Sequence, residues 1–255
     1  MACADQPHVK ALLDRAACPV VTYGFEPGAD CRLEEWRAEG TGARFVTATP
    51  IATGARQGNA PGERLTWSVP LPGRHNALNA AAVVLMARHL GHAPERIQAA
   101  FSTFLGVKRR QELRGEAAGV TVLDDFAHHP TAVRETLAAV RAAYPGRRLW
   151  AVFEPRSFTA RSPRFQAEWP GAFTGADQVA LAPAFRPASG GDMLDTAALA
   201  AAIGALGTPA HAAGSNDALL DYLLAEARAG DVLLLMSNGG FDNLHERVLA
   251  ELRKR

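Results

Sequence analysis

Cysteine and lysine are both scarce in this sequence. The 255 residues contain three cysteines, Cys3, Cys18 and Cys31, which lie near the N-terminus and show neither CxxC spacing nor paired histidines. This arrangement argues against a structural zinc site and against a disulfide framework. Reduced thiols in a cytosolic protein are the simplest interpretation.

Long apolar runs and a large net charge are also absent. The longest apolar runs, such as residues 77–87 and 232–236, are well short of the roughly 20 residues that span a bilayer. The opening MACADQPHVK has no basic segment followed by an apolar one, so a secretory signal is not expected. With 27 basic and 26 acidic residues the net charge is +1, which gives no bulk attraction to nucleic acid or an anionic membrane. We therefore expect a cytoplasmic protein that binds neither and holds any anionic ligand locally.

The pattern of apolar residues changes along the chain. Short strand-like segments, VVTYGF, ARFVTATP and RLTWSVPL, precede two helical segments that begin near His75 and at Pro94. The segment GVKRRQELRG, residues 106–115, is basic, bounded by glycines and poor in apolar residues. We therefore place a domain boundary near Arg114.

Beyond this linker, apolar strands and helices alternate. The strands are near-continuous apolar runs, which is typical of a parallel sheet covered by helices on both faces. The expected strands are VTVLDDF, RLWAVFEP, QVALAPAF and DVLLLMS, and the expected helices lie near residues 131–144, 164–173, 196–206, 216–229 and 243–255. The sequence thus predicts an α/β fold with a mainly parallel sheet.

Unusual polar residues follow four of these strands. The loops LDDFAHHP, FEPRSFTAR, APAFRP and MSNGGF offer acids, imidazoles, arginines and glycines where an apolar strand ends. Ligands of such folds bind at the carboxyl ends of the parallel strands. We therefore expect one crevice lined by all four loops.

Two acids and two histidines are the densest cluster. Asp124 and Asp125 suit the hydroxyls of a ribose or a divalent cation, and the alternative is that one of them caps the helix that begins near Pro130. His128 and His129 are adjacent and have no third ligand nearby, which argues against a metal site. Hydrogen bonding to phosphate or to the loop itself is the favoured role for the histidines.

Other candidate ligand groups have equally plain alternatives. Arg109 and Arg110 suit phosphate because a guanidinium binds two phosphate oxygens at once, but they also suit a solvated hinge. The SNGG at 237–240 could form an anion-binding nest or a tight turn.

A second candidate group opens a helix in the first half of the chain. His75, Asn76 and Asn79 stand where free backbone amides and side-chain amides can meet a nucleotide. For an isolated HNxxN, helix capping and packing is the commoner explanation.

Four segments, in their order along the chain, carry a family resemblance. GRHNALNA, GVKRRQELRG, LDDFAHHPTAV and FEPRSFTAR resemble the Mur ligases of bacterial cell-wall synthesis, and the resemblance extends over roughly residues 20–255. DDFAHHPT together with KRRQELRG and MSNGGF is more similar to the members that recycle a murein tripeptide than to those that add L-alanine.

The resemblance implies roles for particular residues. Arg110, which matches the linker arginine that reaches the ATP phosphates, and Asp125, which matches an acid near the ribose, are the implied catalytic residues. The implied nucleotide-binding residues are His75, Asn76, Asn79, Arg110, Asp125 and His128, and the implied substrate-binding residues are His129, Arg156, Ser237, Asn238 and Gly239. No residue is implied as a metal ligand.

The resemblance also implies a reaction. ATP with Mg²⁺ would convert the carboxylate of UDP-N-acetylmuramate into an acyl phosphate, and the amine of the tripeptide L-Ala-γ-D-Glu-meso-diaminopimelate would then attack it to form an amide. A carboxylate is a poor electrophile, so phosphorylation supplies the leaving group.

The ATP-binding loop of the family, GxxxxGK[ST], is missing. The three lysines, Lys10, Lys108 and Lys254, precede alanine, arginine and arginine. We therefore expect residues 1–110 to be the late, incomplete part of the central ATP-binding domain and residues 115–255 to be the Rossmann-like C-terminal domain. On this interpretation residues 1–110 are the less stable part, and the chain alone does not ligate.

Three alternatives remain open at this point. The chain could derive from an L-alanine-adding ligase, or it could be a non-catalytic module that binds a nucleotide or a muropeptide. It could also be a metal-dependent hydrolase built on the paired acids and histidines.

Overall fold

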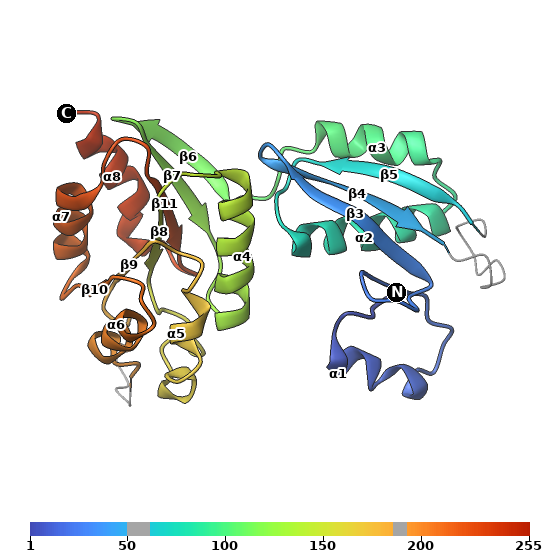
Figure 1. Cartoon of the computed structure of the whole chain (residues 1–255), viewed down its shortest axis with the longest axis horizontal. Helices are drawn as coiled ribbons and strands as arrows, with labels where there is room; N and C mark the ends of the chain where they lie inside the picture. The colour runs from blue at the N-terminus through green and yellow to red at the C-terminus, as the bar shows by residue number, and fades with distance from the viewer. Residues whose placement is uncertain (50–61, 186–192) are drawn as a thin grey trace. The chain divides into compact units, whose positions relative to one another are not determined.

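The chain forms two compact units, Met1–Gly106 and Val107–Arg255, in the computed structural model (Figure 1). The structure describes residues 1–49, 62–185 and 193–255. Pro50, at the end of the expected strand ARFVTATP, and Arg186 and Pro187 of the APAFRP loop lie outside the described residues. None of the helices within the described ranges has the length and apolar character needed to cross a bilayer.

The first unit is a five-stranded sheet with two longer helices. Its strands follow the order β1-β2-β3-β4-β5, parallel from β1 to β3 and antiparallel from β3 to β5. The elements are β1 (Ala2–Cys3), α1 (Pro7–Lys10), a 3₁₀ turn (Leu13–Arg15), β2 (Thr22–Gly24), β3 (Cys31–Glu39), β4 (Gly42–Ala48), β5 (Arg64–Val69), α2 (Arg74–His89) and α3 (Pro94–Thr103).

The core of this unit lies between the sheet and the two helices. Small side chains on α2, among them Ala77 and Ala81, let the helix approach Phe45 and Trp67 of the sheet closely. The indole Nε1 of Trp67 donates to Oγ1 of Thr47 at 2.8 Å, so the buried ring leaves no unpaired donor. β3 was not expected from the sequence because its charged residues, such as Arg32 and Glu34, mask the two-residue period of a half-buried strand.

The second unit is a six-stranded sheet in the order β10-β9-β8-β11-β7-β6. β7 to β11 are parallel, and β6 runs antiparallel to β7 at one edge. The elements are β6 (Glu112–Ala117), β7 (Val120–Asp125), α4 (Pro130–Ala143), β8 (Leu149–Phe153), a 3₁₀ turn (Pro163–Phe165), α5 (Trp169–Ala172), β9 (Gln178–Leu181), α6 (Thr196–Ala205), β10 (Ala210–Ala212), α7 (Asn216–Glu226), β11 (Val232–Met236), a 3₁₀ turn (Phe241–Asn243) and α8 (Leu244–Leu252).

Helices cover both faces of this sheet. Alternate residues of β11 point to opposite sides: Val232, Leu234 and Met236 join the core with α4, α5 and α6, whereas Leu233 and Leu235 join the core with α7 and α8. Figure 1 shows α7 and α8 against one face and α4 against the other. This two-sided burial explains why the strands read as continuous apolar runs, and the predicted α/β fold with a mainly parallel sheet is confirmed.

In the second unit, three details differ from the expected elements. β6 begins at Glu112, inside the segment expected to be a linker, because a short polar edge strand carries little apolar signal. The helix expected near residues 164–173 is a 3₁₀ turn followed by the single turn α5. β10, of three residues, was not anticipated.

Candidate functional site

The carboxyl ends of β7, β8, β9 and β11 bring their loops together. Ser237 N donates to the carbonyl of Asp125 at 3.1 Å, and Glu154 N donates to the carbonyl of Met236 at 3.0 Å. On the other side of β8, Phe185 N donates to the carbonyl of Pro155 at 3.0 Å. The four polar loops predicted from the sequence are therefore neighbours along one edge of the sheet.

Asp125 anchors this edge from within. Its side chain is 1% exposed; Oδ2 accepts from Gln111 N at 2.8 Å and Oδ1 from Ala127 N at 2.7 Å. Burial raises the pKa of this carboxyl, and the two backbone hydrogen bonds oppose that shift. Asp125 thus ties the segment before β6 to the loop after β7, and neither acid caps α4, whose N-cap is His129.

Arg109 joins two of the loops, those that follow β7 and β11. Its Nη2 donates to the carbonyls of Ser237 and Gly239, the latter at 2.6 Å, and its Nε lies 3.6 Å from Oδ2 of Asp124. Its own carbonyl accepts from Phe126 N at 2.8 Å. The next residue, Arg110, is exposed and has its guanidinium carbon 5.6 Å from the centre of the Phe126 ring. The hydrogen bonds of the Arg109 guanidinium are therefore made within the protein, whereas Arg110 is exposed to solvent.

Glu154 organises the loops after β8 and β11. This carboxylate is 4% exposed; Oε2 accepts from Oγ of Ser237 at 2.5 Å and Oε1 lies 3.6 Å from Nη1 of Arg156. Ser237 Oγ in turn accepts from Gly239 N at 2.9 Å. A Cβ on Gly239 would lie 2.0 Å from Cδ of Arg156, so the arginine packs directly on the glycine. Sequence reasoning missed Glu154, although its place directly after a buried strand was an available signal.

Arg156 and Asn238 are the partly exposed members of this group. The Arg156 guanidinium lies 4.2 Å from the centre of the Phe185 ring, and its side chain is about a third exposed. Oδ1 of Asn238 is buried and has no hydrogen-bond partner among the described residues.

The two histidines have local partners. His128 Nδ1 lies 2.7 Å from the carbonyl of Phe126, and its ring meets the Phe126 ring edge-on. His129 caps α4 by accepting from Thr131 N at 3.4 Å, and its ring packs against Phe165. Hydrogen bonding to the loop is one of the two roles favoured from the sequence, and a contact with phosphate stays a prediction.

The remaining predicted residues lie in the first unit, at the start of α2. Asn76 Nδ2 donates to the carbonyl of Pro72 at 2.7 Å, and Asn79 Nδ2 lies 3.4 Å from Asn76 Oδ1. His75 stands beside them in the first turn. The asparagines therefore fix the entry of the chain into the helix, as the commoner explanation of HNxxN requires.

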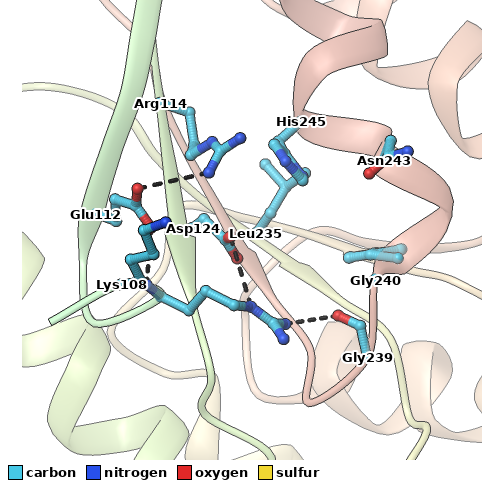
Figure 2. A pocket seen from close by; sticks show the side chains of 11 residues that line it. Lys108, Glu112, Arg114, Asp124, Leu235, Gly239, Gly240, Asn243 and His245 are labelled. Carbon is cyan, nitrogen blue, oxygen red and sulfur yellow. Dashed lines mark hydrogen bonds and ion pairs between the residues drawn. The ribbon is translucent and has the colours of Figure 1, made fainter.

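A cavity of about 240 Å³ opens where β6, β7 and β11 meet α8 (Figure 2). Lys108, Glu112, Arg114, Asp124 and His245 bring charged or ionisable groups to it. Figure 2 shows Arg114 and His245 close together, with Asp124 facing the same space. Adjacent strand residues point to opposite faces, so Asp124 reaches this cavity while Asp125 is buried on the α4 side.

The charged and ionisable residues that line the cavity differ in how fully they are paired by hydrogen bonds and ion pairs. Arg114 pairs with Glu246 at 2.5 Å and Glu112 at 3.5 Å. Partial burial, reinforced by the positive charge of Arg114, lowers the pKa of His245, which favours the neutral imidazole. Asp124, at 6% exposure, accepts no side-chain hydrogen bond from any described residue. His245 was not predicted as a site residue, because it lies more than a hundred residues from Asp124 along the chain.

The described residues contain no group of three or more His, Cys, Asp or Glu side chains placed to hold a metal ion. Chemically, this edge offers guanidinium groups and amides for anions, and one poorly satisfied carboxylate for a cationic or hydroxylic group.

Comparisons with known proteins agree with this architecture. A family model described as Mur ligase, glutamate ligase domain, matches residues 109–239. The chain is 37% identical over 263 residues to UDP-N-acetylmuramate–L-alanine ligase of Acidothermus cellulolyticus, covering 100% of this chain and 52% of that protein. It is 41% identical over 191 residues to UDP-N-acetylmuramate–L-alanyl-gamma-D-glutamyl-meso-2,6-diaminoheptandioate ligase of Escherichia coli K12, covering 74% of this chain and 39% of that protein.

A solved structure gives the same picture. The murein peptide ligase of Psychrobacter arcticus 273-4 superposes with a TM-score of 0.63 at 29% identity, covering 97% of this chain and 50% of that one. The chain spans about half the length of the relatives it matches, or less. Because the family model matches half of the chain and a relative is 37% identical over all of it, the chain belongs to the Mur ligase family.

Proposed function

We propose that this chain supplies the C-terminal part of a murein peptide ligase. That enzyme would use ATP to join L-Ala-γ-D-Glu-meso-diaminopimelate to UDP-N-acetylmuramate in peptidoglycan recycling. The observation that carries the proposal is the Glu154–Arg156–Ser237 group, which holds a partly exposed guanidinium at the carboxyl edge of the sheet. The acceptor tripeptide carries several carboxylates, and a fixed arginine is a suitable partner for one of them.

Each part of the site has a task under this proposal. Arg110, exposed at the start of the second unit, would meet the phosphates of ATP, and Asp125 would hold the loops on which Arg110 stands. His75, Asn76, Asn79 and His128 would lie toward the nucleotide, and His129, Arg156, Ser237, Asn238 and Gly239 toward the peptide. ATP and Mg²⁺ would be cofactors of the whole ligase, and the GxxxxGK[ST] loop that the resemblance assigns to their binding does not occur in this sequence.

Isothermal titration tests the proposal. The purified chain is titrated with the tripeptide, with L-alanine and with ATP plus Mg²⁺, and the expected result is binding of the tripeptide but not of L-alanine. Arg156→Ala should weaken tripeptide binding at least tenfold, because it removes the exposed cation. Arg96→Ala is the matched control, since Arg96 is exposed on α3 and has no ion pair among the described residues. Tripeptide binding that survives Arg156→Ala unchanged would remove the assigned role of this arginine.

L-Alanine addition is the second candidate. It is favoured by the relative from Acidothermus cellulolyticus, which is matched over the whole of this chain, whereas the Escherichia coli relative is matched over 74% of it. Binding of L-alanine in the same titration, with no binding of the tripeptide, would select this candidate. Binding of either ligand by a chain that shows no ligation with ATP would be equally compatible with a non-catalytic binding module, so the same chain is also assayed for ATP-dependent amide formation.

A further inference from the structure

Asp124 is a buried carboxylate without an adequate partner. Its side chain lines the cavity beside α8, and its nearest cation, Nε of Arg109, lies 3.6 Å away, beyond hydrogen-bonding distance. Nη2 of Arg109 donates instead to the carbonyls of Ser237 and Gly239. The Asp124 carboxylate therefore faces the cavity with acceptor capacity that no described residue uses, and a donor on a ligand can reach it from there.

The cavity also presents a cation that has no partner. Lys108 lines it, is exposed, and forms no ion pair or hydrogen bond with the described residues. Arg114, in contrast, is already paired with Glu246 and Glu112. Two charged groups of the lining are therefore unpaired or weakly paired, the ammonium of Lys108 and the carboxylate of Asp124.

A ligand with a single charge does not fit this lining. An anion would lie close to Asp124 and Glu112, and a cation would lie close to Lys108 and Arg114, so either would meet like charges in a partly desolvated space. A group that carries both charges can pair its cation with the acidic lining residues and its anion with the basic ones. The cavity volume of about 240 Å³ is room for the end of an amino acid.

We propose that this cavity binds the zwitterionic end of an amino acid, with Asp124 accepting from its ammonium and Lys108 pairing with its carboxylate. This inference deepens the proposed function and rests on it for the identity of the substrate. In the proposed tripeptide, the side chain of meso-diaminopimelate ends in a free ammonium and a free carboxylate on one carbon. A lysine side chain in the same position ends in an ammonium alone. The cavity therefore selects diaminopimelate over lysine as the third residue of the acceptor peptide.

Three small molecules of similar length test the chemistry on the intact chain. They are meso-diaminopimelate, pimelate, which lacks both amines, and cadaverine, which lacks both carboxylates. Followed by NMR titration of the backbone amides, meso-diaminopimelate should bind at least tenfold more tightly than either analogue and should shift amides of β6, β7 and the start of α8. Equal affinity for pimelate would show a simple anion site and overturn the proposal. Equal affinity for cadaverine would show a simple cation site and overturn it as well.

Two variants locate the site. Asp124→Asn should weaken meso-diaminopimelate at least tenfold, and Lys108→Ala, which changes an exposed side chain and so leaves folding intact, should weaken it several-fold. The control Lys254→Ala, also an exposed lysine, should leave the affinity unchanged. Absence of any meso-diaminopimelate binding by the folded wild-type chain would overturn the inference.

The outcomes separate this inference from the proposed function. Tripeptide binding that Asp124→Asn and Lys108→Ala leave unchanged would end the inference and leave the proposed function standing. Binding of meso-diaminopimelate at this cavity, without binding of the tripeptide, would support the cavity assignment and count against the proposed function.

Discussion

The two ends of the six-stranded sheet differ in how completely their polar groups are paired within the protein. At the amino end, Arg147 donates from Nε to the carbonyl of Gly230 at 2.7 Å and from Nη1 to Oγ1 of Thr121 at 2.9 Å. Its neighbour Arg148 forms a two-bond pair with Asp231, at 2.9 and 2.6 Å. Each of these buried or partly buried groups is matched by another group of the protein.

At the carboxyl end the matching is incomplete. Asp124 has a single cation at 3.6 Å, and Oδ1 of Asn238 and the ammonium of Lys108 have no hydrogen-bond partner among the described residues. Strand polarity places loops and helix starts at this end, which is where ligands of parallel sheets bind. The contrast indicates that the amino end is built for stability, whereas the carboxyl end keeps polar groups available for a ligand.

The largest expected effect comes from a substitution at the amino end of the sheet, which we call the saturated end because its polar groups are paired within the protein. Asp231→Asn removes one side of the Arg148 pair and weakens the bonds that Trp150 Nε1 and Arg228 N donate to the same carboxylate, each at 3.0 Å. We expect a loss of about 2–4 kcal/mol in the free energy of unfolding at pH 7, because a buried partner is left uncompensated. Urea unfolding followed by circular dichroism measures it, and a loss below about 1 kcal/mol would contradict the saturated-end interpretation.

The same variant should show a characteristic pH dependence. Burial alone would raise the pKa of Asp231, but hydrogen bonds from Arg148, Arg228 and Trp150 outweigh burial and lower the pKa below its ordinary value of 3.8. A carboxyl with a lowered folded-state pKa stabilises the protein above its unfolded-state pKa, and this contribution is lost as pH falls through the folded-state pKa. The stability difference between wild type and Asp231→Asn should therefore be constant at neutral pH and shrink below about pH 4. A difference that grows on acidification would show the opposite linkage.

An intermediate effect is expected where the carboxyl end is satisfied. Ser237→Ala removes the donor to Glu154 and the acceptor for Gly239 N, and should cost about 1–2 kcal/mol of unfolding free energy. It should also weaken tripeptide binding, since Arg156 would lose its oriented partner. The control is Ser162→Ala, whose hydroxyl accepts at 3.3 Å from Arg164 N on a surface turn and should cost only about 0.5 kcal/mol. Equal losses in the two variants would show that the Glu154 group is no more than an ordinary surface contact.

The sequence predicts the site edge better than the site itself. Continuous apolar strands followed by polar loops predicted a mainly parallel sheet, which is confirmed, and predicted that the polar loops meet at its carboxyl end, because both follow from local patterns. That this end binds the ligand stays a prediction. The period of two residues also requires Asp124 and Asp125 to point in opposite directions, but it does not say which of them faces a cavity. That depended on α8, which brings His245 and Glu246 to β6 from the far end of the chain. Glu154 and Arg109 likewise lie in motifs that the sequence singles out, but only the packing of the loops shows which groups they contact.

The smallest expected effect, and the sharpest test of the contrast, is Asp124→Asn. At the saturated end an Asp→Asn change is costly, whereas the Asp124 side chain accepts no hydrogen bond from a described residue and has one ion pair, with Arg109 at 3.6 Å. Removing its charge should therefore change the unfolding free energy by less than about 0.5 kcal/mol, while ligand binding at the cavity falls at least tenfold. The two variants, Asp124→Asn and Asp231→Asn, make the same chemical change in two residues of the same sheet, so their difference reports on surroundings rather than on residue type. A loss at Asp124 as large as that at Asp231 would mean that the carboxyl end is as fully matched as the amino end, and the cavity would then have no unsatisfied acid to offer a ligand.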